Sequence, residues 1–391
     1  YTVDIEYTLN AFKKGLKLQT IIFFKDVEVA NVTVELKRPF FRQAIDIMSE
    51  THHSKINLWN HHEPNLYDVE FRLYDNDQLI DCVGSYFGIR HIGIENSWLT
   101  INYTPSYLKM VLDQGYWKDS HLTPPSEEAL LLDIEQALAM GFNGIRMHQK
   151  IEDERFYYYC DILGIYVWLE MPSFYEFNDE AVYRFTREWM EVIQQHYNHP
   201  SIITWVPFNE SWGIPNVPIN RKQQHFTKSI YYLTKTMDQS RPVITNDGWQ
   251  HTISDIITLH DYKEYGEALL SCYRPIEELL NHQKTKGLPP RLPFASNYRY
   301  HGQPIMLTEY GGIAFEKNKD EGWGYGQMVK DEQDFIQRLK SLTDAIQSLP
   351  FCSGYCVTQL TDVQQEMNGL LDEDRNPKVP LEAIRAINEG I

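Results

Sequence analysis

The stretch SIITWVPFNESWG, residues 201–213, places an apolar run directly before an adjacent amide and carboxylate. The run from Ile202 to Phe208 predicts a buried strand. A carboxylate next to such a run is costly to bury unless a partner neutralises it or the protein uses it chemically. The stretch therefore predicts a strand that ends at Asn209 and Glu210, with two polar side chains at its carboxyl end.

Apolar strands alternate with helical stretches from about Tyr107 to the end of the chain. A helix is predicted at residues 126–141, SEEALLLDIEQALAMG, from apolar residues at helical spacing after a serine cap. The expected strands are 108–117, 142–149, 165–173, 201–210, 241–247, 255–262, 304–312 and 351–360. Eight such units over about 280 residues favour a closed (β/α)₈ barrel over an open doubly wound sheet.

Residues 1 to about 90 read as all-β instead, with alternating apolar and polar residues and frequent turn signals. The expected strands are 3–10, 17–24, 30–37, 68–75 and 85–90. Short strands in a segment of this length predict a small antiparallel, immunoglobulin-like β-sandwich. We therefore expect a sandwich domain at 1–92 and a TIM-barrel domain at 93–391.

Charge and hydropathy exclude several partners. The formal net charge is −18, a surface that repels phosphate backbones, so nucleic acid is not expected as a partner. No run of 18 apolar residues is present, so no membrane span is expected. The chain starts without Met and without a visible signal peptide. We expect a fragment of a longer protein, and a cytoplasmic location.

The cysteines and glycines indicate no metal or nucleotide site. Five cysteines without a CxxC pair favour reduced, buried thiols over a disulfide framework or a zinc site. The GWGYG stretch at 322–326 follows no strand, so we do not expect it to bind a nucleotide. No metal site and no cofactor are predicted. Binding of a divalent cation near Glu170 stays an alternative.

In a barrel of this kind the active site lies at the carboxyl ends of the strands. Every expected strand turns polar at that end, at Asp113, Gln114, Arg146, His148, Glu170, Asn209, Glu210, Asn246, Asp247, His260, Tyr262, Glu309, Tyr310 and Gln359. Helix caps or turn residues explain one or two of these positions but not all of them.

Two carboxylates, Glu210 and Glu309, each follow an uninterrupted apolar strand. Such a pair suits glycoside hydrolysis, in which one carboxyl gives a proton to the leaving oxygen and the other attacks the anomeric carbon. A retaining mechanism needs the groups about 5–5.5 Å apart and an inverting one needs more than about 6.5 Å. The apolar strand before Glu210 predicts a partly dry setting that keeps this carboxyl protonated.

The segments EPNLYDVEFRLY, GFNGIRMHQ, NHPSIITWVPFNESW, RPVITND and PIMLTEYGG resemble glycoside hydrolase family 2 over nearly the whole chain. That family includes β-galactosidases, β-glucuronidases and β-mannosidases. The resemblance implies that Glu210 is the general acid/base and Glu309 the nucleophile. It also implies that Asn209 binds the sugar 2-hydroxyl, that Arg146 lies near the nucleophile, and that Tyr262 orients it.

Several family features are missing. The usual N-terminal jelly-roll domain is absent, so we expect weak or no activity from the isolated chain. Glucuronidases carry an Asn-x-Lys that holds the sugar carboxylate, whereas here Asn368 has no lysine two residues later. The resemblance therefore disfavours a glucuronidase, slightly prefers a β-galactosidase-like specificity, and leaves the sugar unnamed.

Four further strand-end groups, Asp113, His148, His260 and Gln359, are predicted to contact substrate. Trp249 is predicted as a stacking platform for the sugar, and Trp323 is a second stacking candidate. His148 is either a pocket residue or a core histidine, and Trp249 and Trp323 either stack on the sugar or only pack against the protein. Trp212 either forms the floor of the leaving-group site or only packs the loop. Glu170 is expected behind the reacting groups, with a metal ligand or an ion-pair partner as alternatives.

Two classes of function follow from the sequence. The first is a retaining exo-β-glycosidase that acts on an oligosaccharide or glycoside. The second is a catalytically silent carbohydrate-binding barrel. A homo-oligomer is compatible with both.

Overall fold

The computed structural model describes residues 1–48, 56–281, 291–315 and 322–391. It divides into two compact units: Tyr1–Arg90 with Asn198–Pro200, and His91–Tyr197 with Ser201–Ile391. The domain boundary between residues 92 and 93 stays a prediction.

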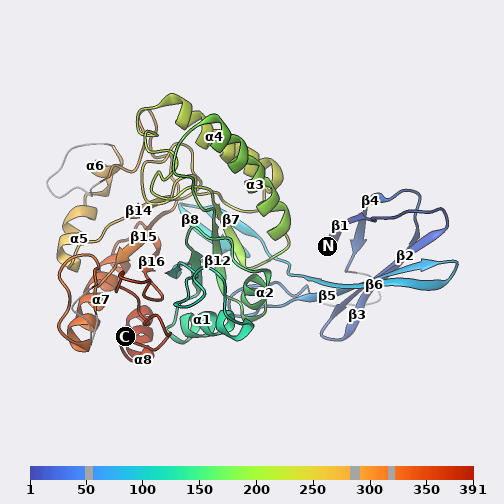
Figure 1. Ribbon diagram of the computed structural model, residues 1–391, viewed down its shortest axis with the longest axis horizontal. Helices are drawn as coiled ribbons and strands as arrows, with labels where there is room; N and C mark the ends of the chain where they lie inside the picture. The colour runs from blue at the N-terminus through green and yellow to red at the C-terminus, as the bar shows by residue number, and fades with distance from the viewer. Residues whose placement is uncertain (49–55, 282–290, 316–321) are drawn as a thin grey trace. The chain divides into compact units, whose positions relative to one another are not determined.

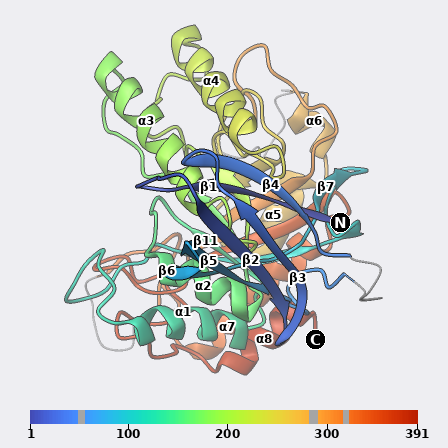
Figure 2. The same cartoon turned by 90° about the vertical axis from the view of Figure 1, so that its right-hand side faces the viewer.

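The first unit is a β-sandwich of two antiparallel sheets (Figure 1). The larger sheet has the order β3-β2-β5-β6, and β1 pairs with β4; Figure 2 shows β2 and β3 side by side. The strands are β1 (Thr2–Thr8), β2 (Leu16–Phe24), β3 (Val27–Glu35), β4 (Phe40–Asp46), β5 (Tyr67–Asp75) and β6 (Gln78–Phe87). Ile22, Ile45 and Val69 pack in one core cluster that joins both sheets. The predicted sandwich is confirmed, but β4 was missed, because Arg42 and Gln43 interrupt its apolar pattern.

The second unit contains a barrel of parallel strands inside a ring of helices (Figure 1). Seven strands pair in the order β13-β12-β11-β10-β16-β15-β14. They are β10 (Leu108–Asp113), β11 (Gly144–Met147), β12 (Tyr166–Glu170), β13 (Ile202–Val206), β14 (Ile257–His260), β15 (Ile305–Gly311) and β16 (Cys352–Thr358). The segment expected as the fifth barrel strand is irregular, and Val243 and Asp247 join it to the β13 segment through isolated parallel bridges. The predicted (β/α)₈ class is confirmed.

Helices follow most of the strands, as expected. They are α1 (Glu127–Ala139), α2 (Glu154–Leu163), α3 (Asp179–His196), α4 (Arg221–Met237), α5 (Gly266–Tyr273), α6 (Ile276–Leu280), α7 (Glu332–Gln347) and α8 (Leu381–Glu389). The Ser126 side chain accepts from the Ala129 N–H at the start of α1, which confirms the predicted cap. A small antiparallel sheet, β7 (Ile92–Glu95), β8 (Trp98–Ile101) and β9 (Thr104–Pro105), precedes the barrel and was not predicted.

Strand β13 is held against α3 and α4 by two buried tryptophans. Trp205 and Trp189 pack edge to face at 6.0 Å. The Trp189 indole donates to Thr234 Oγ1 and the Trp205 indole donates to Asp238 Oδ2, each at 2.8 Å. These bonds satisfy the polar atoms that burial would otherwise leave unpaired. The wall before Glu210 is therefore packed against two helices without unpaired indole donors.

Four of the five cysteines are buried and all five are free thiols. The prediction of burial is wrong for Cys82, which is exposed. It lies in β6, a strand at the edge of its sheet whose side chains are largely exposed. None of the described helices combines the length and the apolar composition that crossing a lipid bilayer requires.

Candidate active site

Arg146 is the central cation at the carboxyl ends of the barrel strands. Its Nη1 lies 2.9 Å from Glu309 Oε1 and 2.9 Å from Asp247 Oδ2. Its Nη2 donates to Asn209 Oδ1 at 2.7 Å, and its Nε donates to Glu170 Oε2 at 2.9 Å. The side chain is fully buried. A buried guanidinium with this many acceptors ties four strand ends together, because its donors form a rigid fork.

Glu309 projects from β15 and is held by two donors. Besides Arg146, the Tyr262 hydroxyl donates to Glu309 Oε2 at 2.5 Å. The Tyr262 ring stacks on Tyr325 with ring centroids 3.4 Å apart. Gly312 permits this stack, because a Cβ there would lie 2.4 Å from the Tyr325 ring. The structure thus brings Arg146, Tyr262 and Glu309 together, as the resemblance implied.

Glu210 lies in a tight turn just beyond β13. Its φ is +49° and that of Ser211 is +60°, which is left-handed backbone. The Glu210 N–H donates to the Asp247 carbonyl at 3.0 Å, and the Ser211 N–H donates to Asn246 Oδ1 at 2.8 Å. This turn aims the carboxylate back over the barrel, where one Glu210 oxygen lies within 4.8 Å of a Glu309 oxygen.

His260 lies between the acidic groups. Its Nδ1 is 2.7 Å from Glu210 Oε1 and 3.3 Å from Glu309 Oε2, and its Nε2 is 3.0 Å from Asp247 Oδ2. Burial alone lowers the pKa of His260, but the charge of Glu309 and the hydrogen bonds to Asp247 and Glu210 raise it to about 10. The three carboxylates therefore favour the imidazolium form of the ring.

This charge changes the state of Glu210. Burial raises the pKa of the Glu210 carboxyl, but the His260 hydrogen bond and charge, with Arg146, outweigh it and lower the pKa below its ordinary value. The prediction that a dry setting keeps Glu210 protonated is therefore wrong for the free protein. The apolar strand supplies the burial, but the sequence did not show that a cation would face the carboxylate.

Glu170 lies at the end of β12, behind Arg146. Its Oε2 accepts from Arg146 Nε, and its Oε1 accepts from the Gln149 N–H at 3.0 Å and lies 2.9 Å from His148 Nδ1. Both oxygens are engaged, with a guanidinium beside one of them, so the group fits an ion-pair partner better than a ligand for a divalent cation. His148 is partly exposed beside it.

A cavity of about 520 Å³ opens beside Glu210. Its lining consists of Glu210, Trp249, His260, Asp261, Tyr262, Lys263, Arg291 and Tyr325. Arg291 lies over the Trp249 ring at 4.2 Å. A volume of this order accommodates a small ligand. The structure thus places Trp249 in the same cavity as the candidate acid/base.

Three groups at this site, Tyr325, Lys263 and Arg291, were not among the residues predicted from the sequence. Asp247 was predicted as a strand-end carboxylate without a role, and it links Arg146 to His260. Tyr325 stands in the GWGYG stretch, where only Trp323 was predicted to stack on a sugar. Lys263 and Arg291 carry no local signal, because they reach the cavity only through loops.

Gln359, after β16, is buried and bonded to neighbouring side chains. Its Oε1 accepts from Gln114 Nε2 at 2.7 Å, and its Nε2 donates to Asn368 Oδ1 at 2.8 Å. Glu366 accepts from both Gln114 and Asn368.

Trp323 is half exposed and packs edge to face on Tyr325 at 5.8 Å, whereas Trp212 is half exposed just after the Glu210 turn.

Asp113, another predicted substrate contact, has different hydrogen-bond partners from the residues described above. It accepts from the Gly115 N–H at 2.8 Å, and burial raises its pKa although that bond and the charges of Arg375 and Lys150 act the other way. Its described contacts do not include Glu210 or Glu309.

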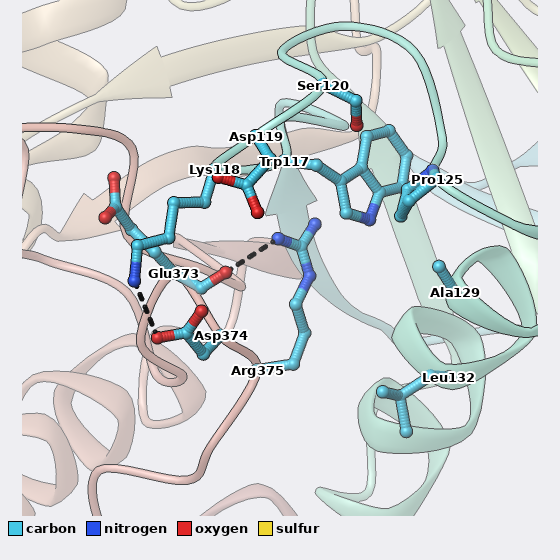
Figure 3. Close-up of a pocket in the computed structure, with 10 residues that line it drawn as sticks. All are labelled: Trp117, Lys118, Asp119, Ser120, Pro125, Ala129, Leu132, Glu373, Asp374 and Arg375. Atoms are coloured by element: carbon cyan, nitrogen blue, oxygen red, sulfur yellow. Dashed lines mark hydrogen bonds and ion pairs between the residues drawn. The ribbon is translucent and has the colours of Figure 1, made fainter.

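A second cavity of about 250 Å³ lies on the Arg375 side (Figure 3). Figure 3 shows Lys118 paired with Asp374 and the Trp117 ring facing the Arg375 guanidinium. Neither candidate glutamate lines this cavity.

Sequence profiles of known families match nearly the whole chain. The profile described as "Glycosyl hydrolases family 2, TIM barrel domain" matches residues 92–391, and "Glycosyl hydrolases family 2" matches residues 3–90. The chain belongs to glycosyl hydrolase family 2. Among the relatives of this family 2 member, a β-galactosidase of Leuconostoc mesenteroides is 30% identical over 356 residues, which are 83% of this chain and 31% of that protein.

Other relatives carry other names. A β-glucuronidase of Streptococcus agalactiae is 22% identical over 398 residues, 90% of this chain and 62% of that protein. A Bacteroides uniformis β-glucuronidase structure superimposes with a TM-score of 0.78 at 18% identity, covering 100% of this chain and 48% of that one. An Eisenbergiella tayi β-galacturonidase structure gives 0.75 at 20% identity, with coverage of 100% and 69%. At these identities the structural likeness concerns the fold.

Proposed function

We propose that the protein is a retaining exo-β-glycosidase in which Glu309 is the nucleophile and Glu210 the general acid/base. The observation that carries the proposal is the approach of the two carboxylates within 4.8 Å of each other. Retaining enzymes place their carboxyl groups about 5–5.5 Å apart, whereas inverting enzymes leave room for a water between them. Membership of family 2 and the resemblance of the flanking motifs support the same roles.

The partners of each group suit these roles. Arg146 and Tyr262 hold Glu309 from two sides, which favours a fixed direction of attack on the anomeric carbon. Glu210 is more exposed than Glu309, with 21% of its side chain accessible against 7%. It borders the open cavity, where a leaving group has room. In the second step a water takes the place of the leaving group, and Glu210 accepts its proton.

For the sugar, we propose a neutral β-galactoside-like substrate rather than a glucuronide. Asn368 accepts from Gln359 and donates to Glu366, and the Glu366 carboxylate would repel a carboxylate on the sugar at that place. The β-galactosidase relative agrees with this choice, and the β-glucuronidase relative makes the glucuronide the necessary comparison.

A panel of nitrophenyl β-glycosides tests the proposal on the full-length protein that carries this chain, because the chain spans about a third of the β-galactosidase relative. We expect turnover of the β-galactoside above the β-glucuronide, and its loss in Glu309→Gln. Glu382→Gln, an exposed position in α8, is the matched control and should keep full activity.

Three outcomes would contradict the proposal. Absence of turnover on every sugar would favour the catalytically silent carbohydrate-binding barrel, and sugar binding by calorimetry would then identify it. An unaffected Glu309→Gln variant would exclude the nucleophile. An inverted anomeric product in a proton NMR time course would replace the retaining mechanism by an inverting one.

A further inference from the structure

We propose that His260 is a positioning residue that acts through Glu210: its ring stores the proton that Glu210 delivers to the leaving-group oxygen. The proposal rests on the acid/base role of Glu210 given above. It adds a proton source behind the carboxylate, so that the acid is a pair of residues.

The two ring nitrogens of His260 both face carboxylate oxygens. Nδ1 lies 2.7 Å from Glu210 Oε1, and Nε2 lies 3.0 Å from Asp247 Oδ2. An ionised carboxylate only accepts hydrogen bonds, and a neutral imidazole has only one N–H. With both carboxylates ionised, either neutral tautomer would direct a nitrogen lone pair at a carboxylate, so this geometry favours the doubly protonated ring.

The ring is also fixed in place. Only 2% of the His260 side chain is exposed. Gly248 packs directly on the ring, since a Cβ at that position would lie 2.2 Å from three ring atoms. Asp247, on the far side of the ring, is itself held by Arg146 Nη1 at 2.9 Å and by Thr308 Oγ1 at 3.0 Å. The Nδ1–H is therefore directed at Glu210.

The charged surroundings come from several strands and favour a proton on this ring. Three carboxylates, those of Glu210, Asp247 and Glu309, lie within 3.3 Å of its nitrogens. The other nearby titratable groups are Asp261, Arg146, His148, His251, Tyr262, Lys263, Arg291 and Tyr325. The pKa of His251 is lowered by burial to about 4, so it stays neutral.

The proton moves in two balanced transfers. In the first half-reaction the Nδ1–H bond breaks and a Glu210 O–H bond forms, with the electron pair left on Nδ1. That O–H bond then breaks as the leaving oxygen takes the proton and the electron pair of its bond to the anomeric carbon. In the second half-reaction Glu210 removes a proton from water as the water oxygen displaces Glu309, and the proton returns to Nδ1.

The charge of Glu309 controls when the first proton transfer, from His260 to Glu210, takes place. Its Oε2 lies 3.3 Å from Nδ1, and its negative charge helps to retain the proton on the ring. When Glu309 forms its bond to the anomeric carbon, it loses that charge. The imidazolium then becomes more acidic at the moment when the leaving group needs a proton.

His260→Gln tests the role, because glutamine keeps a hydrogen-bond donor but no ionisable group. We expect the alkaline limb of kcat/KM against pH to move down by about 2 units or more, because a carboxyl replaces the imidazolium as the titrating acid. We also expect kcat to fall for alkyl glycosides, which need protonation of the leaving group, and to change little for dinitrophenyl glycosides. An unchanged alkaline limb would overturn the proposal, whereas equal losses on both substrates would indicate a structural role only.

A second measurement is independent of turnover. Histidine labelled with ¹⁵N reports the protonation of each ring nitrogen by NMR, and the His260→Gln spectrum assigns the His260 signals. We expect an imidazolium at pH 8 in the wild type, and an earlier loss of its proton in Glu210→Gln. A neutral His260 at pH 7 would overturn the proposal. An imidazolium in a protein that hydrolyses no glycoside would instead show that the proposed function fails while the pair exists.

Discussion

Arg146 and Glu309 form an ion pair of 2.9 Å in which the guanidinium is fully buried and the carboxylate is almost so. The same guanidinium contacts Asp247, Glu170 and Asn209. One cation thus organises groups from strands that are distant in the sequence, and its removal would take the shared cation away from three buried carboxylates.

Arg146→Lys should reduce kcat/KM by about 10²–10³-fold, because lysine keeps the charge but not the planar fork of donors. Arg241→Lys is the matched control, since Arg241 is also buried and pairs with Asp238 at 2.6 Å away from the site. Both variants should unfold at lower denaturant concentration. Full activity in Arg146→Lys, or an equal loss in Arg241→Lys, would contradict the assignment.

Tyr262→Phe removes the hydroxyl that donates to Glu309 at 2.5 Å. Hydrogen bonds to charged groups contribute roughly 1.5–3 kcal/mol, so we expect kcat to fall by about 10–100-fold while the fold is kept. Tyr273→Phe is the control, because that hydroxyl donates to the buried Asp261 at 3.0 Å instead. Steady-state kinetics on one nitrophenyl substrate compare the two, and an equal kcat in both would argue against an orienting role of Tyr262.

Gly248→Ala should displace His260, since the new methyl would occupy the position of the ring. The φ of Gly248 is +77°, so backbone strain adds to the clash. Gly302→Ala separates the two effects, because its φ is +89° and nothing lies within 4 Å of the added Cβ. We expect the loss of activity only at position 248, with some loss of thermal stability at both. Preserved activity in Gly248→Ala would show that the ring tolerates displacement.

His251 should make the protein less stable in mild acid. Burial lowers its pKa from an ordinary value near 6.5 to about 4, so the unfolded chain binds a proton that the folded protein excludes. The sign of the linkage is a loss of stability as the pH falls through this window, by about 2 kcal/mol between pH 7.5 and pH 5.

Urea unfolding at these two pH values measures the effect. His251→Gln, which keeps an acceptor for the Thr258 N–H, should show a smaller difference between the two pH values than the wild type. His225→Gln, at an exposed position in α4, should retain the full difference. An unchanged pH dependence in His251→Gln would assign it to other groups.

The barrel could be predicted from the sequence because each of its units has a local sequence pattern. An apolar strand, a turn and an amphipathic helix are visible within about 30 residues, and the polar group at each strand end is adjacent to the run that buries it. Strand β4 was harder to predict, because Arg42 interrupts its apolar pattern. The irregular form of the fifth barrel segment was also harder to predict, because only isolated bridges hold it.

What the sequence by itself determined was the set of strand-end side chains, including Glu210, His260 and Glu309. The tertiary structure decided which of them meet, because closing a barrel brings together strand ends that no local spacing relates. It gave Asp113 the Gly115 N–H as a partner and set His260 against Glu210. The protonation of a buried carboxyl depends on the charges within a few ångströms, and those distances exist only after the strands have closed.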